Sequence, residues 1–156
     1  MNTVLSKYDL TFMAKKALSK IPFFGNIIRG VGFLFLDRNN PTKDAYQLAR
    51  GIKYLKTNTC SVAIAPEGTR NFTDELLLPF KDGCFIMATK AQKPIVVAVF
   101  KGTENIKKNL LFKVHKVTLD FTDCIYPEEF NQMTQEELCE KVRQSMLKVL
   151  TEESTK

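Results

Sequence analysis

The sequence contains a single histidine, no tryptophan and no paired-cysteine motif, and these absences exclude whole classes of site. One histidine, His115, and four cysteines without Cys-x-x-Cys spacing provide no clustered ligand set for a metal ion. We therefore expect no metal centre. The cysteines are expected to be reduced, mostly buried thiols of a cytosolic protein.

Long apolar runs are absent as well. The longest apolar region, residues 21–36, is interrupted by Asn26, Arg29 and several glycines, and it is shorter than the roughly 20 residues that a helix needs to cross a bilayer. The first residues alternate between polar and apolar side chains and carry no secretory signal. We therefore do not expect the chain to span a membrane, although it can lie on one.

Positive charge is what the sequence has in excess. Lysine and arginine number 23 against 17 acidic residues, which gives a net charge of +6 and a pI near 9.1. Such a charge suits a partner rich in phosphate, such as lipid headgroups, coenzyme A or nucleic acid. Nucleic acid is not expected, because no P-loop, zinc-finger spacing or RNP-like motif is present and the charge is spread along the chain.

The apolar and polar pattern predicts alternating strands and helices. Strands are expected at residues 8–14, 32–36, 61–65, 94–100 and 113–123, and helices at 22–30, 41–56, 82–91 and from Thr134 onward. The capping residues are Asp82 for the third helix and the capping box at 134–137 for the last. Two helices carry apolar stripes: Ala45, Leu48, Ala49, Ile52 and Leu55, and Leu138, Val142, Met146, Val149 and Leu150.

This order predicts an α/β fold with a mostly parallel central sheet covered by helices. The apolar run at 61–65 is typical of an interior strand in such a sheet, and residues 94–100 form another continuous apolar strand. A length of 156 residues, of which 44% are hydrophobic, suits one domain over residues 1–156.

The sequence Ala-Pro-Glu-Gly-Thr-Arg at residues 65–70 follows one of the predicted buried strands. Pro66 ends the strand and Gly68 permits a sharp turn, which carries a carboxylate, a hydroxyl and a guanidinium. This combination can hold a phosphate, but a purely structural turn is an equal alternative on the pattern alone.

A second polar pair, Asp37-Arg38, follows the strand predicted at 32–36. Because the carboxyl ends of parallel strands meet at one edge of a sheet, Arg38 and Arg70 are expected to converge on one phosphate. A surface salt bridge is the alternative for each arginine.

Several blocks, taken together in order, resemble the lysophosphatidate and glycerol-3-phosphate acyltransferase family. They are Lys15-Lys16 with Ile-Pro-Phe-Phe-Gly at 21–25, the strand ending in Asp37-Arg38, Pro-Glu-Gly-Thr-Arg at 66–70, Leu-Pro-Phe-Lys at 78–81 with Gly83, and the proline-led strand at 94–99. The resemblance implies a glycerolipid acyltransferase fold. It also implies that Arg38, Glu67, Gly68, Thr69 and Arg70 bind the substrate phosphate, with Glu67 ordering the turn or an arginine.

The resemblance implies an activity in phospholipid biosynthesis. A fatty acyl group passes from acyl-CoA or acyl carrier protein to the hydroxyl of a lysophospholipid such as 1-acyl-glycerol-3-phosphate. No cofactor is implied beyond this acyl donor, and the setting implied is the cytoplasmic face of a membrane. Lys15, Lys16, Lys20 and Arg29 bracket Phe23 and Phe24, which either dock at an anionic bilayer or pack in an ordinary core.

The family's Asn-His-x-x-x-x-Asp block, which supplies the general base, is missing before Lys15. We therefore assign no catalytic residue in this chain and expect it to be N-terminally truncated relative to the family. His115 and Asp120 match the literal spacing, but on a strand they point to opposite faces about 16 Å apart. Two hypotheses stay open: an acyltransferase whose base is supplied from outside these residues, or an inactive relative that binds phospholipid or acyl donor.

Overall fold

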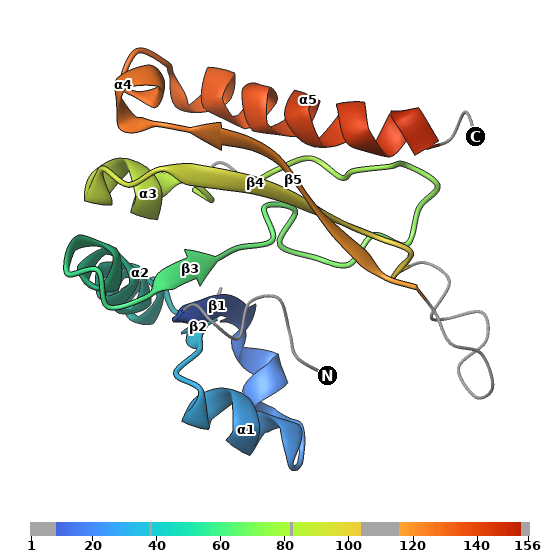
Figure 1. Cartoon of the computed structure of the whole chain (residues 1–156). Coiled ribbons are helices and arrows are strands. Elements are labelled where there is room, and N and C mark those ends of the chain that lie inside the picture. The colour runs from blue at the N-terminus through green and yellow to red at the C-terminus, as the bar shows by residue number, and fades with distance from the viewer. Residues whose placement is uncertain (1–8, 38, 82, 104–115, 154–156) are drawn as a thin grey trace. The chain divides into compact units, whose positions relative to one another are not determined.

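The structure, a computed structural model, describes residues 9–37, 39–81, 83–103 and 116–153 (Figure 1). The chain divides into two compact units. The first comprises Met1–Arg70 and Gly83–Lys93, and the second comprises Asn71–Asp82 and Pro94–Lys156. The prediction of a single domain over residues 1–156 stays a prediction.

The first unit contains a parallel sheet of three short strands. These are β1 (Leu10–Lys15), β2 (Leu34–Leu36) and β3 (Ser61–Ala63), in the order β2-β1-β3. The register places Lys15 opposite Leu36 on one side of β1 and Phe12 opposite Ala63 on the other. A parallel sheet flanked by helices confirms the predicted α/β class.

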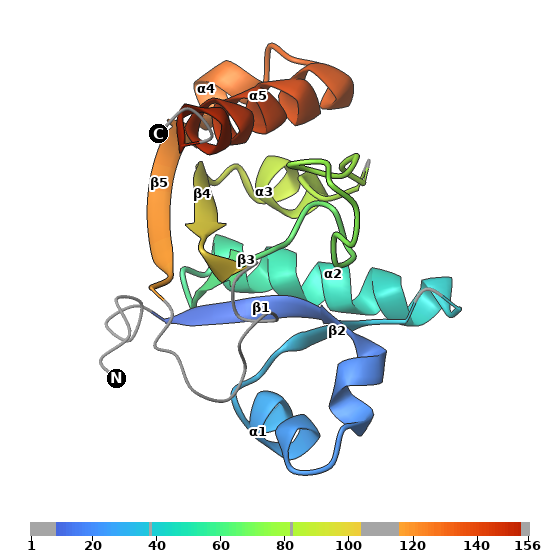
Figure 2. The same ribbon diagram turned by 90° about the vertical axis from the view of Figure 1, so that its right-hand side faces the viewer.

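Helices connect these strands on both sides of the sheet. The 3-10 helix η1 (Lys16–Lys20) and α1 (Phe24–Gly30) join β1 to β2, and α2 (Pro41–Lys56) joins β2 to β3. The connection from β1 to β2 moves the chain to one side of the sheet, and the connection from β2 to β3 moves it back past β1 to the other side. Two right-handed crossovers that move in opposite directions place their helices on opposite faces of the sheet, as Figure 2 shows for α1 and α2.

The bounds of α2 agree with the sequence prediction because its start is strongly specified. The Asn40 side chain accepts a hydrogen bond from the Lys43 backbone N–H at 3.1 Å, and Pro41 occupies the first turn. The predicted apolar stripe is only partly correct. Leu48, Ile52 and Leu55 are half-buried but Ala45 and Ala49 are exposed.

The buried face of α2 is centred on Gly51. A Cβ at Gly51 would lie 2.3 Å from the Met87 Sδ and 3.1 Å from the Leu34 Cδ1, so glycine permits close packing of α2 on α3 (Ile86–Ala91) and β2. The helix predicted at 82–91 begins later than expected, and Asp82 lies outside the described residues.

A second close approach holds α1 against η1. A Cβ at Gly25 would lie 2.2 Å from the Ser19 carbonyl oxygen, a backbone atom that cannot move aside without displacing η1. The Gly25 N–H donates to the Ile21 carbonyl at 2.7 Å, and Ser19 Oγ donates to the Lys16 carbonyl at 2.7 Å. The lack of space for a Cβ therefore explains why the last residue of the Ile-Pro-Phe-Phe-Gly block is a glycine.

Replacing Gly25 with alanine is expected to destabilise the protein by about 1–3 kcal/mol, the usual cost of forcing an atom into an occupied site. Gly30→Ala is the matched control on the same helix, because a Cβ there meets no atom within 4 Å. The control is expected to be neutral or to stabilise by up to about 1 kcal/mol through helix propensity. Urea unfolding measures both, and equal effects of the two variants would contradict the steric account.

The second unit is a β-ribbon covered by a helix. β4 (Ile95–Lys101) and β5 (Thr118–Ile125) pair antiparallel, and the register skips Thr122 in a β-bulge. Figure 1 shows α5 (Gln135–Glu153) lying along this ribbon. The strand predicted at 113–123 begins and ends later than expected, and His115 lies outside the described residues.

The core of this unit is formed by the facing sides of the ribbon and α5. The buried residues include Val97, Val99, Ile125, Leu138 and Val142. Thr122 Oγ1 and Ser145 Oγ lie 2.9 Å apart and link β5 to α5. The short helix α4 (Pro127–Phe130) leads from β5 to α5 and buries Phe130. The predicted α5 stripe is confirmed at Leu138 and Val142, whereas Met146, Val149 and Leu150 are half-buried.

The predicted capping box at the start of α5 is confirmed in both directions. The Thr134 N–H donates to Glu137 Oε2 at 2.7 Å, and the Glu137 N–H donates to Thr134 Oγ1 at 3.2 Å. The bonds from Thr134 hold the pKa of the Glu137 carboxyl below its ordinary value of 4.5.

We expect Glu137→Gln to lower the melting temperature at pH 7, because a neutral amide accepts a weaker hydrogen bond than a carboxylate. The pKa of Glu137 is lower in the folded state than in the unfolded state. Its stabilisation is therefore present above the unfolded pKa and is lost as pH falls through the folded value. Thermal unfolding at pH 7 and at a pH below the folded-state pKa measures this effect. The melting temperatures of the variant and the parent should differ at pH 7 and converge at the acid pH. A difference that persists below the folded pKa would show that the charge of Glu137 is irrelevant.

The cysteines are less buried than expected. Cys60, Cys84 and Cys139 are half-buried and Cys124 is exposed. The expectation of mostly buried thiols is therefore wrong, because Cys60 and Cys84 lie just before β3 and α3, and Cys124 and Cys139 lie at β5 and α5 positions that are not on the buried faces of these elements. Burial, with a smaller contribution from Asp9, raises the pKa of Cys60.

Candidate functional site

The turn at Pro66–Arg70 has the geometry that the sequence predicts. The Gly68 N–H donates to the Ala65 carbonyl at 3.0 Å, which closes a tight turn with Pro66 and Glu67 in its centre. Gly68 has a φ of +62°, a left-handed conformation that other residues rarely adopt. Glu67 and Gly68 are half-buried, whereas Thr69 and Arg70 are exposed. The turn therefore presents its hydroxyl and guanidinium to solvent.

The turn after β2 is organised around Asp37. The Lys16 Nζ donates to Asp37 Oδ2 at 2.6 Å, and this bond holds the pKa of the Asp37 carboxyl below its ordinary value of 3.8. The Asp37 N–H donates to Asp44 Oδ1 at 2.5 Å, and the Asn40 N–H donates to the Asp37 carbonyl at 2.6 Å. Arg38, the other predicted phosphate ligand, lies outside the described residues.

Both turns leave the same edge of the parallel sheet. β2 and β3 flank β1, so the two strands lie two strand spacings apart, about 10 Å, measured across the sheet. β3 ends three residues short of β2 in the register of β1, and Ile64 and Ala65 lead from it into the turn. This arrangement fits the expectation that ligands of open α/β sheets gather at the carboxyl ends of strands.

A cavity of about 350 Å³ adjoins the Asp37 turn. It is lined by Lys16, Ser19, Phe35, Asp37, Lys43, Tyr46 and Gln47. Two lysines against one carboxylate leave this lining with net positive charge, which suits an anionic ligand. The sequence placed Lys16 in a family block and among the basic residues around Phe23 and Phe24, not beside Asp37, and it gave no role to Lys43. The feature that could have indicated Lys43 as a site residue is its position in the first turn of α2, the helix that Asn40 caps.

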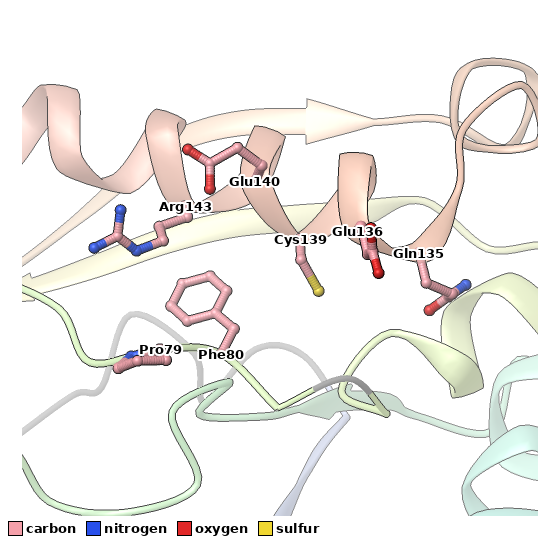
Figure 3. A pocket seen from close by; sticks show the side chains of 7 residues that line it. All are labelled: Pro79, Phe80, Gln135, Glu136, Cys139, Glu140 and Arg143. Carbon is pink, nitrogen blue, oxygen red and sulfur yellow. The ribbon is translucent and has the colours of Figure 1, made fainter.

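The second unit contains a cavity of its own, of about 570 Å³, which the sequence reasoning did not predict. It lies between α5 and the Leu-Pro-Phe-Lys segment. Its lining consists of Pro79, Phe80, Gln135, Glu136, Cys139, Glu140 and Arg143. In Figure 3 the ring of Phe80 lies between the side chains of Arg143 and Cys139. The mixture of acidic, basic and apolar groups indicates no single ligand class.

Among the described residues, no helix combines the length and the apolar composition that crossing a bilayer requires.

Comparison with known proteins identifies the family. The family model for acyltransferases matches residues 1–101, about two thirds of the sequence. The chain belongs to the acyltransferase family. This confirms the resemblance on which the block-by-block interpretation depends.

The acyltransferase chain has relatives of known name in several organisms. It is 34% identical over 145 residues to the 1-acyl-sn-glycerol-3-phosphate acyltransferase of Saccharomyces cerevisiae, covering 91% of this chain and 48% of the relative. It is 40% identical over 93 residues to the enzyme of that name from Escherichia coli, covering 60% of this chain and 38% of the relative. The chain thus spans about half, or less, of these relatives.

A solved structure supports the same assignment. The crystal structure of the 1-acyl-sn-glycerophosphate (LPA) acyltransferase from Thermotoga maritima superposes with a TM-score of 0.69 at 26% identity. The match covers 95% of this acyltransferase chain and 58% of the Thermotoga chain.

Proposed function

We propose that this protein transfers a fatty acyl group from acyl-CoA or acyl carrier protein to the free hydroxyl of 1-acyl-glycerol-3-phosphate. The observation that carries the proposal is family membership together with relatives named 1-acyl-sn-glycerol-3-phosphate acyltransferase. No cofactor other than the acyl donor is proposed, because acyl transfer from a thioester needs only a base and a positioned acceptor.

The proposed role of the candidate site is to hold the acceptor's phosphate. Arg70 and Arg38 supply guanidiniums, whose fork matches two phosphate oxygens. Thr69 adds a hydroxyl donor, and Gly68 gives the turn the left-handed conformation that presents Thr69 and Arg70. Glu67 orders the turn, since its carboxylate would repel the phosphate. Binding the phosphate fixes the orientation of the acceptor far from the reacting hydroxyl, and positioning of this kind contributes a large part of many rate enhancements.

The reaction also needs a base to remove the hydroxyl proton as the oxygen attacks the thioester carbon. The proton passes to the base, the ester bond forms, and the thiolate of the donor leaves. His115 is the sole histidine in the sequence and follows the phosphate blocks instead of preceding them. This observation favours a second candidate function, in which the chain binds lysophosphatidate or acyl donor without turnover.

The acceptor is an amphiphile that resides in membranes, so the proposed place of action is the cytoplasmic face of a membrane, with peripheral contact to anionic lipid. The basic residues of the first unit support this proposal, since anionic headgroups attract them at short range.

The test pairs two acceptors that differ only in phosphate: 1-acyl-glycerol-3-phosphate and the corresponding 1-acylglycerol. With radiolabelled acyl-CoA, phosphatidate is expected from the first acceptor and no diacylglycerol from the second. Binding that depends on phosphate without product would establish the second candidate. Equal binding and equal use of the two acceptors would contradict both.

A further inference from the structure

An exposed apolar surface covers the turn before α1 and one side of α1 itself. Its five residues are Ile21, Phe23, Phe24, Ile27 and Val31, which are 45%, 86%, 46%, 63% and 58% exposed. We call these five residues the α1 surface. Phe24, Ile27 and Val31 lie at helical spacing on one stripe, while Ile28, on the neighbouring stripe, is buried at 3%. The helix therefore packs one face inward and leaves a second apolar face uncovered.

The backbone holds the most exposed of these side chains in an unusual conformation. Phe23 has a φ of +60° and a ψ of −55°, and the Phe24 N–H donates to the Pro22 carbonyl at 2.7 Å, which is the strained geometry of a classic γ-turn and costs a bulky residue free energy. A phenylalanine in a strained turn that gains no burial is not explained by packing. The close contact of Gly25 with the Ser19 carbonyl fixes the turn, so the side chain is displayed by a rigid segment.

The charge around the α1 surface has one sign. Residues 10–36 contain four basic residues, Lys15, Lys16, Lys20 and Arg29, and no aspartate or glutamate. Lys15, Lys20 and Arg29 are exposed. Exposed aromatic and branched apolar side chains rimmed by positive charge match the chemistry of an anionic bilayer surface, where rings enter the headgroup region and lysines remain among the phosphates.

We propose that the α1 surface docks the protein on an anionic phospholipid bilayer. The inference rests on the proposed function in one respect, that the acceptor resides in such a bilayer. η1 leads from the carboxyl end of β1 into α1, and Lys16 at its start contacts Asp37. Docking through the α1 surface therefore brings the Asp37 turn and its cavity toward the headgroups from which the acceptor is drawn.

The absence of tryptophan from the sequence permits a direct test. Phe23→Trp introduces a single tryptophan, whose emission is expected to shift to shorter wavelength on addition of vesicles containing phosphatidylglycerol and to be quenched by brominated acyl chains. Phe121→Trp, at a β5 residue that is 58% exposed, is the matched control and is expected to show neither change. Changes at both positions, or at Phe121 alone, would overturn the proposal.

Co-sedimentation with the same vesicles measures the contribution of each group. Phe23→Ala combined with Ile27→Ala is expected to lower the partition coefficient about 100-fold, at about tenfold per apolar side chain. Lys15→Gln and Lys20→Gln are expected to lower it about fivefold each, and vesicles of phosphatidylcholine alone should bind weakly. The vesicles contain neither lysophosphatidate nor acyl donor, so failure here leaves the proposed reaction intact.

A second copy of the chain is the competing occupant of the α1 surface. Sedimentation velocity without lipid distinguishes it, since the bilayer proposal predicts the same sedimentation coefficient for the parent and the Phe23→Ala, Ile27→Ala variant. A dimer that dissociates in the variant, with vesicle binding unchanged, would overturn the proposal.

Discussion

Replacing Arg70 with alanine is expected to weaken the binding of lysophosphatidate by about 30-fold, corresponding to the loss of a charge-assisted contact of about 2 kcal/mol. Arg70 is exposed, so a solvated ion pair there would be worth much less. A bound phospholipid, however, shields the contact, and the planar fork engages two phosphate oxygens at once. Titration calorimetry with a short-chain, water-soluble lysophosphatidate measures the loss.

The neutral 1-acylglycerol provides the internal control for Arg70→Ala, because the variant should bind it as the parent does. Arg50→Ala is the matched arginine control. Arg50 lies on α2, where its guanidinium donates to Gln47 and Tyr54 and lies over the Tyr54 ring. The control is expected to lower stability slightly and to leave lysophosphatidate affinity unchanged. Equal losses from both variants would show that Arg70 acts through the fold and not on the phosphate.

The second large effect concerns turnover. The 156-residue chain is expected to form phosphatidate about 10²–10⁴-fold more slowly than a family enzyme that carries the Asn-His-x-x-x-x-Asp block, because this factor is what a positioned general base contributes. Lysophosphatidate affinity should be retained, since the phosphate ligands are separate from the base. Product formation from radiolabelled acyl-CoA measures the rate.

His115→Gln is the control for this expectation. If His115 has no catalytic role, any residual rate is the same in the parent and the variant. A fast rate that His115→Gln abolishes would identify His115 as the base. A fast rate that His115→Gln leaves unchanged would show that another residue of the chain acts as the base.

The elements that the sequence predicts most closely are those with strong local signals. Asn40 and Pro41 specify the start of α2, and Thr134 with Glu137 specifies the start of α5. The predicted helix at 82–91 begins late because Phe85, and not a polar cap, precedes α3. Helix starts without a capping side chain carry a weak signal, and packing against α2 then decides the boundary.

The sequence did not predict which residues of α2 are buried, because burial there depends on contacts with residues far away in the sequence. Ala45 and Ala49 fit the helical period of an apolar stripe, yet Gly51 is the buried position of α2 because Met87 and Leu34 occupy the space beside it. Hydrophobic periodicity cannot identify a glycine as a packing site. The antiparallel pairing of β4 with β5 likewise depends on contacts between residues far apart in the sequence, which the local apolar pattern does not specify.

The candidate site was predicted from the two strand-end turns, and the structure places both at one edge of the parallel sheet. The contact of Lys16 with Asp37 was not predictable from spacing, since 21 residues separate them and only the β1–β2 pairing brings them together. The roles of Arg38, Glu67, Gly68, Thr69 and Arg70 in phosphate binding stay predictions.

A crystal structure of the protein with glycerol 3-phosphate tests the central claim most directly. The account predicts the phosphate at the carboxyl edge of β2, β1 and β3, with the guanidiniums of Arg38 and Arg70 both within hydrogen-bonding distance of its oxygens. A phosphate bound elsewhere, or the two arginines on opposite faces of the sheet, would contradict it.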